Sequence, residues 1–272
     1  MTVRALLLCA LVLSSACVSR VPPFDPAAPL RIEGEIAFDD AHLLELHLSR
    51  PCELDPMHPL ILYATGDGGW RGKDEEAFER MTRWGYPLVG FSSPTYLGHI
   101  VRHTHQATPP DVARDFERII RIAKARMSLP DNMRTVLVGV SRGSGLAVAA
   151  AGEPVFQPLL VGVVAVALTR EEEYVHRLRR NRKAPQQPPV MVMLDNYEYL
   201  PRLRNLPLSI IQSVHDNYLP AEEARRLLGP DSRLHQLHPI ASKNHSFTDA
   251  REPLYAQMKS SLEWVCQLGV EP

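Results

Sequence analysis

The stretch TVLVGVSRGSGLAVAAA, residues 135–151, decides the fold of this chain. Its first six residues form a nearly continuous apolar run, which predicts a strand buried on both faces. Residues 143–151 are small and apolar, which predicts a helix packed closely on a sheet. Between the two, GVSRG at residues 139–143 fits the pattern G-x-S-x-G. A serine on a strained strand-to-helix turn is the arrangement of a nucleophile elbow, so Ser141 is the candidate nucleophile. The alternative is a glycine-rich turn that only packs or binds phosphate.

The segments around this stretch alternate between strands and helices. Strands are predicted at residues 31–38, 43–49, 58–65, 87–92, 159–168, 208–214 and 233–239, and helices at residues 74–84, 111–127, 221–228 and 253–268. This alternation predicts an α/β fold whose central sheet is mainly parallel and carries helices on both faces. Residues 170–189 are charged and then proline-rich, which predicts a small lid-like insertion, with a short strand or lid segment at 189–194.

The N-terminus has the pattern of an export signal. Arg4 precedes an apolar run, small residues follow, and then comes Cys17. We therefore expect a signal peptide at residues 1–16, a tether at 17–30 and one domain at 31–272. Cys17 resembles the lipidated cysteine of bacterial lipoproteins, although Ser14 stands where such sequences have leucine. Lipidation at Cys17 predicts a periplasmic, membrane-anchored protein; ordinary secretion and an uncleaved anchor are the alternatives.

Composition excludes several classes of protein. Of the 272 residues, 30 are Lys or Arg and 31 are Asp or Glu, so the formal net charge of −1 argues against a nucleic-acid-binding surface. Four cysteines are too few for a disulfide scaffold. Cys52 and Cys266 could pair in an oxidising compartment or remain two separate thiols.

A serine nucleophile needs a base and an orienting acid, and the predicted strand ends supply both. Asp216 follows the strand at 208–214, and His245 follows the strand at 233–239. The order serine, acid, histidine is that of α/β-hydrolases. Asp195, which also follows an apolar run, is the rival acid.

Other histidines have simpler interpretations. His215 is expected to pack or to lie behind the acid, and His235 and His238 are expected within the last strand.

An oxyanion needs backbone donors, which we expect from Arg142 and from the loop GDGGW at residues 66–70. The N–H of Asp67 is the first choice in that loop and that of Gly68 the alternative. The carboxylate of Asp67 either faces the acyl group, where it would repel an anion and hold a cation, or caps the helix that starts near Asp74.

On these residues the chain resembles the α/β-hydrolase superfamily across roughly residues 30–270. The loop GDGGW and the export signal more narrowly resemble the VirJ/AcvB-type bacterial virulence proteins. The resemblance implies Ser141 as nucleophile, Asp216 as acid and His245 as base, and it implies hydrolysis of aminoacylated phospholipid in the periplasm. The chain differs from the usual family pattern at Val140, Arg142 and Asn244.

Two functions are therefore expected in turn. The first is an exported serine hydrolase that cleaves small-molecule or lipid esters through an acyl-enzyme and uses neither metal nor cofactor, because no motif for either is present. The second is a non-catalytic lipoprotein of the cell envelope that binds a partner. The basic stretch HRLRRNRK, residues 176–183, suits an anionic headgroup, an anionic protein partner or a solvated helix face.

Overall fold

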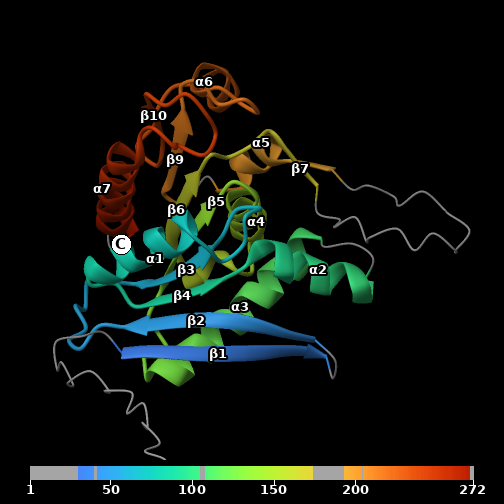
Figure 1. Ribbon diagram of the computed structural model, residues 1–272, viewed down its shortest axis with the longest axis vertical. Coiled ribbons are helices and arrows are strands. Elements are labelled where there is room, and N and C mark those ends of the chain that lie inside the picture. The colour runs from blue at the N-terminus through green and yellow to red at the C-terminus, as the bar shows by residue number, and fades with distance from the viewer. Residues whose placement is uncertain (1–29, 40–41, 105–107, 174–192, 204, 270–272) are drawn as a thin grey trace, which may run out of the picture.

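The apolar runs of the sequence form one central eight-stranded sheet in the computed structural model (Figure 1). The structure describes residues 30–39, 42–104, 108–173, 193–203 and 205–269. The strands, in spatial order, are β1 (Leu30–Asp39), β2 (His42–Arg50), β4 (Leu88–Phe91), β3 (Leu60–Ala64), β5 (Thr135–Val140), β6 (Leu160–Val166), β9 (Leu208–Ser213) and β10 (His235–Ile240).

Most of this sheet is parallel. Strands β4, β3, β5, β6, β9 and β10 run in one direction, whereas β2 pairs antiparallel with both β1 and β4. The register pairs Ala64 with Gly139, and Val140 with Val166. Parallel strands end at the same edge of a sheet, so the segments that follow β3, β5, β9 and β10 gather at one edge.

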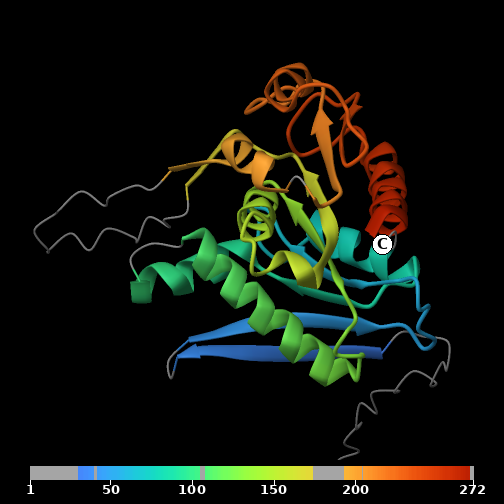
Figure 2. The same cartoon turned by 180° about the vertical axis from the view of Figure 1, so that it is seen from behind.

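Helices cover both faces of the sheet (Figures 1 and 2). One face contacts α2 (Ser93–Thr104), α3 (Pro109–Met127) and α4 (Arg142–Ala151). The other face contacts α1 (Lys73–Arg83) and α7 (Arg251–Gly269). The short helix α6 (Ala221–Leu228) packs on β9 and β10. The mainly parallel sheet with helices on both faces confirms the predicted α/β fold.

The strands supply two cores because their side chains alternate between faces. In β3, Leu60 and Leu62 pack among the residues of α3 and α4, while Ile61 and Tyr63 pack among those of α1 and α7. All four side chains are buried. Burial of one such apolar side chain stabilises the fold by about 1.5–3 kcal/mol, which is why a continuous apolar run specifies a central strand.

A small insertion lies between β6 and β9, where the sequence predicts one. Here β7 (Glu171–Glu173) pairs antiparallel with β8 (Met193–Asp195), and α5 (Asn196–Tyr199) follows. Residues 174–192, which include the basic stretch 176–183, lie outside the described residues, as do residues 1–29 with Cys17. The role of the insertion as a lid and the lipidation of Cys17 stay predictions.

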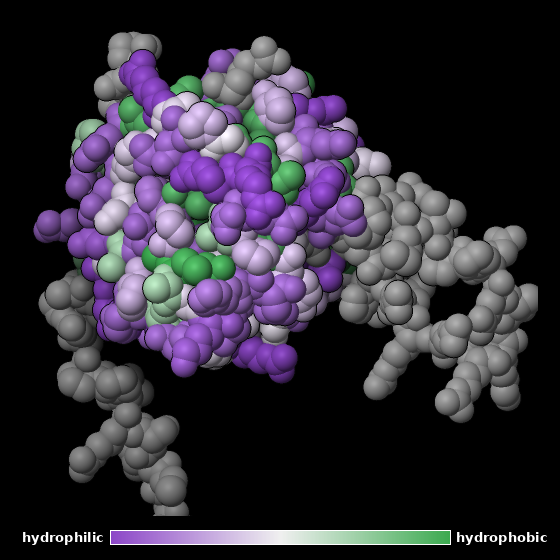
Figure 3. All heavy atoms as spheres, turned by 90° about the horizontal axis from the view of Figure 1, so that it is seen from above, coloured by the Kyte–Doolittle hydropathy of each residue, from purple (hydrophilic) through white to green (hydrophobic). Residues whose placement is uncertain are grey.

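The surface of the described part is mainly hydrophilic. Figure 3 shows small separate hydrophobic areas on one face, surrounded by hydrophilic side chains. Within the residues that the structure describes, no helix has both the length and the apolar character needed to cross a bilayer.

Candidate active site

Ser141 occupies a strained turn between β5 and α4. Its φ of 52° and ψ of −117° are uncommon for a residue with a side chain. Hydrogen bonds hold the turn on both sides: the Ser141 N–H donates to the carbonyl of Val166 at 2.8 Å, and the N–H of Ser144 donates to the carbonyl of Ser141 at 2.8 Å. The structure thus has the strand, turn and helix that a nucleophile elbow requires.

Two glycines make room for this turn, as the sequence predicts. A Cβ atom on Gly139 would lie 2.2 Å from the carbonyl oxygen of Gly143. A Cβ atom on Gly143 would lie 2.1 Å from the carbonyl oxygen of Ala64 on β3. Because both obstacles are backbone atoms, no rotation of a side chain can relieve the overlap.

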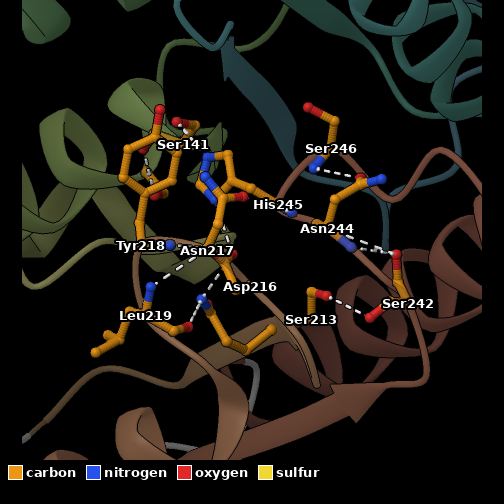
Figure 4. Close-up of polar contacts among 12 residues, drawn as sticks. Ser141, Ser213, Asp216, Asn217, Tyr218, Leu219, Ser242, Asn244, His245 and Ser246 are labelled. Atoms are coloured by element: carbon orange, nitrogen blue, oxygen red, sulfur yellow. Dashed lines mark hydrogen bonds and ion pairs between the residues drawn. The ribbon is translucent and has the colours of Figure 1, made fainter.

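Ser141, His245 and Asp216 form one chain of hydrogen bonds (Figure 4). The Nε2 atom of His245 lies 2.8 Å from the Oγ of Ser141. Its Nδ1 atom lies 2.7 Å from the Oδ2 of Asp216. The three side chains come from segments that follow β5, β10 and β9, so the common edge of the parallel sheet brings together residues 104 positions apart.

The carboxylate of Asp216 is fully buried and surrounded by donors. Its Oδ1 accepts hydrogen bonds from the N–H groups of Tyr218 at 2.8 Å and Leu219 at 3.3 Å. Its Oδ2 accepts a bond from Nε2 of Gln212 at 3.1 Å, in addition to the bond with His245. A buried charge is costly without such partners, so these donors both stabilise the carboxylate and fix its direction. The sequence analysis missed Gln212, which lies four residues before Asp216 on β9.

The loop that carries His245 is fixed by its own polar side chains. Oδ1 of Asn244 accepts bonds from the N–H groups of Ser246 at 3.1 Å and Thr248 at 3.3 Å. The hydroxyl of Ser213, at the end of β9, donates to the carbonyl of Ser242 at 3.0 Å. These bonds tie the histidine loop to the strand that precedes the acid.

Tyr218 borders the candidate site. Its ring meets the ring of His245 edge to face, with 4.8 Å between the ring centroids. The residue is 69% exposed, while the side chain of His245 is 11% exposed. Tyr218 therefore presents an apolar ring to solvent directly beside the proposed base. The sequence gave no signal for this position beyond its place in the loop after β9.

The loop of residues 66–70 lies against the elbow. A Cβ atom on Gly66 would be 3.5 Å from the Cβ of Ser141. The N–H of Gly69 donates to the carbonyl of Gly66 at 3.0 Å, which closes a tight turn. The loop is thus next to the proposed nucleophile, as an oxyanion loop must be. The donor roles of the N–H groups of Asp67, or of Gly68, and of Arg142 stay predictions.

Trp70 anchors this loop to the sheet. Its ring stacks on His47 of β2 with centroids 3.8 Å apart and meets Phe78 of α1 edge to face at 5.0 Å. A Cβ atom on Gly90 of β4 would lie 2.5 Å from the indole, so only glycine leaves space for it there. The tryptophan of GDGGW therefore fixes the loop from which the oxyanion donor is expected.

The carboxylate of Asp67 has a partner that the sequence analysis did not predict. Arg142 forms an ion pair with it through Nε, and its Nη2 donates to Oδ2 at 3.3 Å. The expectation that Asp67 caps the following helix is wrong. Helix α1 begins after Gly72, whose N–H donates to Oε2 of Glu75 at 3.1 Å.

Asp195, the rival acid, has a structural role. Its Oδ1 accepts bonds from the N–H groups of Tyr197 at 2.9 Å and Glu198 at 3.2 Å, so it caps α5. Its Oδ2 pairs with Nε of Arg170 at 3.2 Å. His235 and His238 lie in β10, as predicted.

Cys52 and Cys266 form no disulfide, so the alternative of two separate thiols holds. Burial raises the pKa of the Cys266 thiol to about 11, which makes it a poor nucleophile at neutral pH. Among the described residues, no group of three or more His, Cys, Asp or Glu side chains is arranged to hold a metal ion.

Comparison with known proteins agrees with this geometry. Residues 58–155 match the model of the family described as bacterial virulence protein (VirJ). No curated protein sequence matches the chain.

Solved structures extend the similarity to most of the chain, at low sequence identity. Est1E from Butyrivibrio proteoclasticus shares 12% identity with a TM-score of 0.58, and the match covers 88% of this chain and 99% of that one. An alpha-beta serine hydrolase homologue from Coxiella burnetii shares 16% identity with a TM-score of 0.56, and the match covers 85% and 97%. A Pyrococcus furiosus esterase shares 12% identity with a TM-score of 0.59, and the match covers 86% and 90%. The chain therefore has the α/β-hydrolase fold and, over residues 58–155, resembles the VirJ family of bacterial virulence proteins.

Proposed function

We propose that this chain is a serine hydrolase that cleaves carboxylic esters through an acyl-enzyme on Ser141. One observation carries the proposal: the hydrogen-bonded chain from Oγ of Ser141 through His245 to Asp216, with bonds of 2.8 and 2.7 Å. A nucleophile within reach of a base that is itself oriented by a third group is the mark of an activated serine.

The first half of the reaction transfers the acyl group. His245 takes the proton from Ser141 while Oγ attacks the ester carbonyl carbon, and a tetrahedral oxyanion forms. The carbon–oxygen bond to the alcohol then breaks, and the histidine returns the proton to the alcohol oxygen. Asp216 holds the proton on Nδ1 throughout, which leaves Nε2 free to accept the serine proton.

The second half restores the serine. Water attacks the acyl carbonyl, His245 takes a proton from that water, and the carboxylic acid leaves as the proton returns to Ser141. The backbone N–H groups of Arg142 and Asp67 are our proposed donors to the oxyanion in both halves, with that of Gly68 as the alternative to Asp67.

The substrate class that we propose is a lipid or other apolar ester. Tyr218, which is 69% exposed, supplies an aromatic ring beside His245 against which an alkyl chain or ring can pack. The resemblance to VirJ adds aminoacylated phospholipid as the substrate to test first. Export through residues 1–16 and lipidation at Cys17 belong to the same proposal, because an anchored periplasmic enzyme meets such lipids in the membrane.

A fluorophosphonate probe tests the mechanism, because it reacts only with an activated serine. Purified residues 18–272 should be labelled, and Ser141→Ala should not. Asp216→Asn should label far more slowly and lower kcat on a p-nitrophenyl ester by about 10⁴-fold, since the imidazole loses its orienting carboxylate. The matched control is Ser260→Ala on α7, an exposed serine outside the site, which should label like the parent.

The competing function is a partner-binding protein of the cell envelope that uses the fold without catalysis. A parent protein that is folded by circular dichroism yet neither labelled nor active on esters would overturn the hydrolase proposal and leave the binding function.

A further inference from the structure

Asp74 is a buried carboxylic acid in the first turn of α1, and the catalytic steps above do not use it. The residue is 1% exposed. Its Oδ1 accepts hydrogen bonds from the hydroxyl of Tyr63 at 2.9 Å and from the N–H of Gly66 at 3.3 Å. Its Oδ2 is buried and has no hydrogen-bond partner among the described residues.

These bonds connect Asp74 to the proposed oxyanion loop. Gly66 is the first residue of that loop, and it lies against Ser141. The peptide unit that joins Gly66 to Asp67 carries the N–H that we propose as an oxyanion donor. A restraint on the Gly66 N–H therefore limits the rotation of the next peptide and aims its N–H.

A cavity of about 20 Å³ lies beside the unpartnered oxygen of Asp74. Its lining includes Tyr63, Val140, Ser246 and Tyr255. Val140 precedes the proposed nucleophile and Ser246 follows the proposed base, so the cavity lies behind both. This volume suffices for one water molecule, and buried water commonly satisfies otherwise unpaired polar atoms.

Burial of a carboxyl group also has a cost. Loss of solvent raises the pKa of Asp74, although the bonds from Tyr63 and Gly66 oppose that rise. An apolar side chain would avoid this cost and fill the cavity. A polar group at this position is therefore explained by what it holds in place.

We propose that Asp74 is a positioning residue for the oxyanion loop: its Oδ1 fixes the Gly66 amide and so aims the Asp67 N–H, while its Oδ2 binds one water molecule in the cavity. The proposal rests on the hydrolase function proposed above. It assigns Asp74 no contact with the substrate.

The test compares Asp74→Ala with Asp74→Asn in the full mature chain. The alanine variant loses the acceptor, so kcat on a p-nitrophenyl ester should fall by about 10–100-fold, while KM changes by less than about threefold. Affinity for an alkyl boronic acid, whose adduct on Ser141 presents an oxygen to the oxyanion donors, should fall by the same factor as kcat/KM. The asparagine variant keeps an acceptor oxygen for Gly66 and Tyr63, so kcat should stay within about threefold of the parent.

Three further measurements keep the proposal open to refutation. Glu75→Gln, in the same turn of α1 but exposed, is the matched control and should leave kcat and boronate affinity unchanged. If Asp74→Ala does not fold, Asp74→Ser carries the same expectation, because its shorter hydroxyl cannot reach Gly66. A crystal structure of the parent should show one ordered water bonded to Oδ2 of Asp74.

The outcomes separate this proposal from the one on which it rests. A parent that does not react with fluorophosphonate refutes the hydrolase function itself. An active parent whose folded Asp74→Ala variant retains both kcat and boronate affinity refutes only the positioning role. An asparagine variant as impaired as the alanine variant refutes that role too, and a cavity without water refutes the role of Oδ2.

Discussion

Asp67 and Arg142 are 75 residues apart in the chain and form an ion pair beside the elbow serine. The pair joins the proposed oxyanion loop to the first residue of α4. Asp67 is the more exposed member, at 64% against 20% for Arg142. The two residues whose backbone N–H groups we propose as oxyanion donors are thus connected through their side chains, so the position of one donor depends on that of the other.

A double-mutant cycle with Asp67→Ala and Arg142→Ala measures this coupling. The interaction free energy in urea unfolding should be about 0.2–1 kcal/mol, because exposed ion pairs are screened by solvent. Ester turnover should fall by a similar factor in each single variant and by little more in the double variant, since either change removes the same restraint. Effects that multiply in the double variant would contradict a shared role.

Replacement of Ser141 by glycine should stabilise the protein and abolish turnover. The backbone φ of 52° is unfavourable for serine and accessible to glycine. The relief of strain exceeds the added freedom of the unfolded chain, so the free energy of unfolding should rise by about 1 kcal/mol. Chemical denaturation of Ser141→Gly beside Ser141→Ala measures this. Equal stability of the two variants would argue against strain at the elbow.

Two glycine-to-alanine changes should have opposite effects on stability. In Gly143→Ala the new Cβ would lie 2.1 Å from the carbonyl oxygen of Ala64, and the free energy of unfolding should fall by about 2–3 kcal/mol. In Gly98→Ala on α2 the new Cβ meets no atom within 4 Å, so helix propensity should raise that free energy by about 0.5–1 kcal/mol. Thermal and urea unfolding of the two variants provide the comparison. A mild effect at Gly143 would contradict the close approach of β3 to the elbow.

Asp231 should contribute to stability in a pH-dependent way. Arg225, whose Nη1 lies 2.5 Å from its Oδ1, lowers the pKa of the Asp231 carboxyl, and the N–H of Leu237 lowers it further, against a smaller effect of burial. A carboxyl whose pKa is lowered by folding stabilises the protein above its unfolded pKa, near 3.9, and loses that contribution as pH falls through the folded pKa.

The variant Asp231→Asn should therefore be less stable than the parent at pH 7, by less than about 1 kcal/mol because the pair is half exposed. This difference should shrink below about pH 4, where the parent is protonated as well. Urea unfolding at pH 7, 5 and 3 measures it. A difference that stays constant over this range would exclude the carboxylate as its cause.

The sequence was most informative where chemistry and topology coincide. The apolar runs that became β3, β5, β6 and β9 predicted buried strands, and chain order placed an acid and a histidine after two of them. Parallel strands end at one edge, so Ser141, Asp216 and His245 could be expected together before any coordinates. The distances of 2.7 and 2.8 Å between their atoms come from the structure.

What the sequence did not predict depends on long-range pairing. Arg142 meets Asp67, and Gly90 accommodates Trp70, through contacts between strands and loops that no local pattern specifies. Helix α2 is different, because Ser93-Pro94 is a helix-start signal that Gly98 outweighed in the sequence analysis. The segment β7 is a strand only because β8 pairs with it.

The position of β10 at the edge of the sheet sets an order of events for the maturing chain. The loop with His245 follows this outermost strand, which is also the last strand in sequence. A polypeptide that folds from its N-terminus assembles the elbow while the serine still has no base. Truncated or half-folded copies then carry an inert hydroxyl, and hydrolytic power arrives with the final docking step. Activity in this architecture is thus a report that folding has been completed.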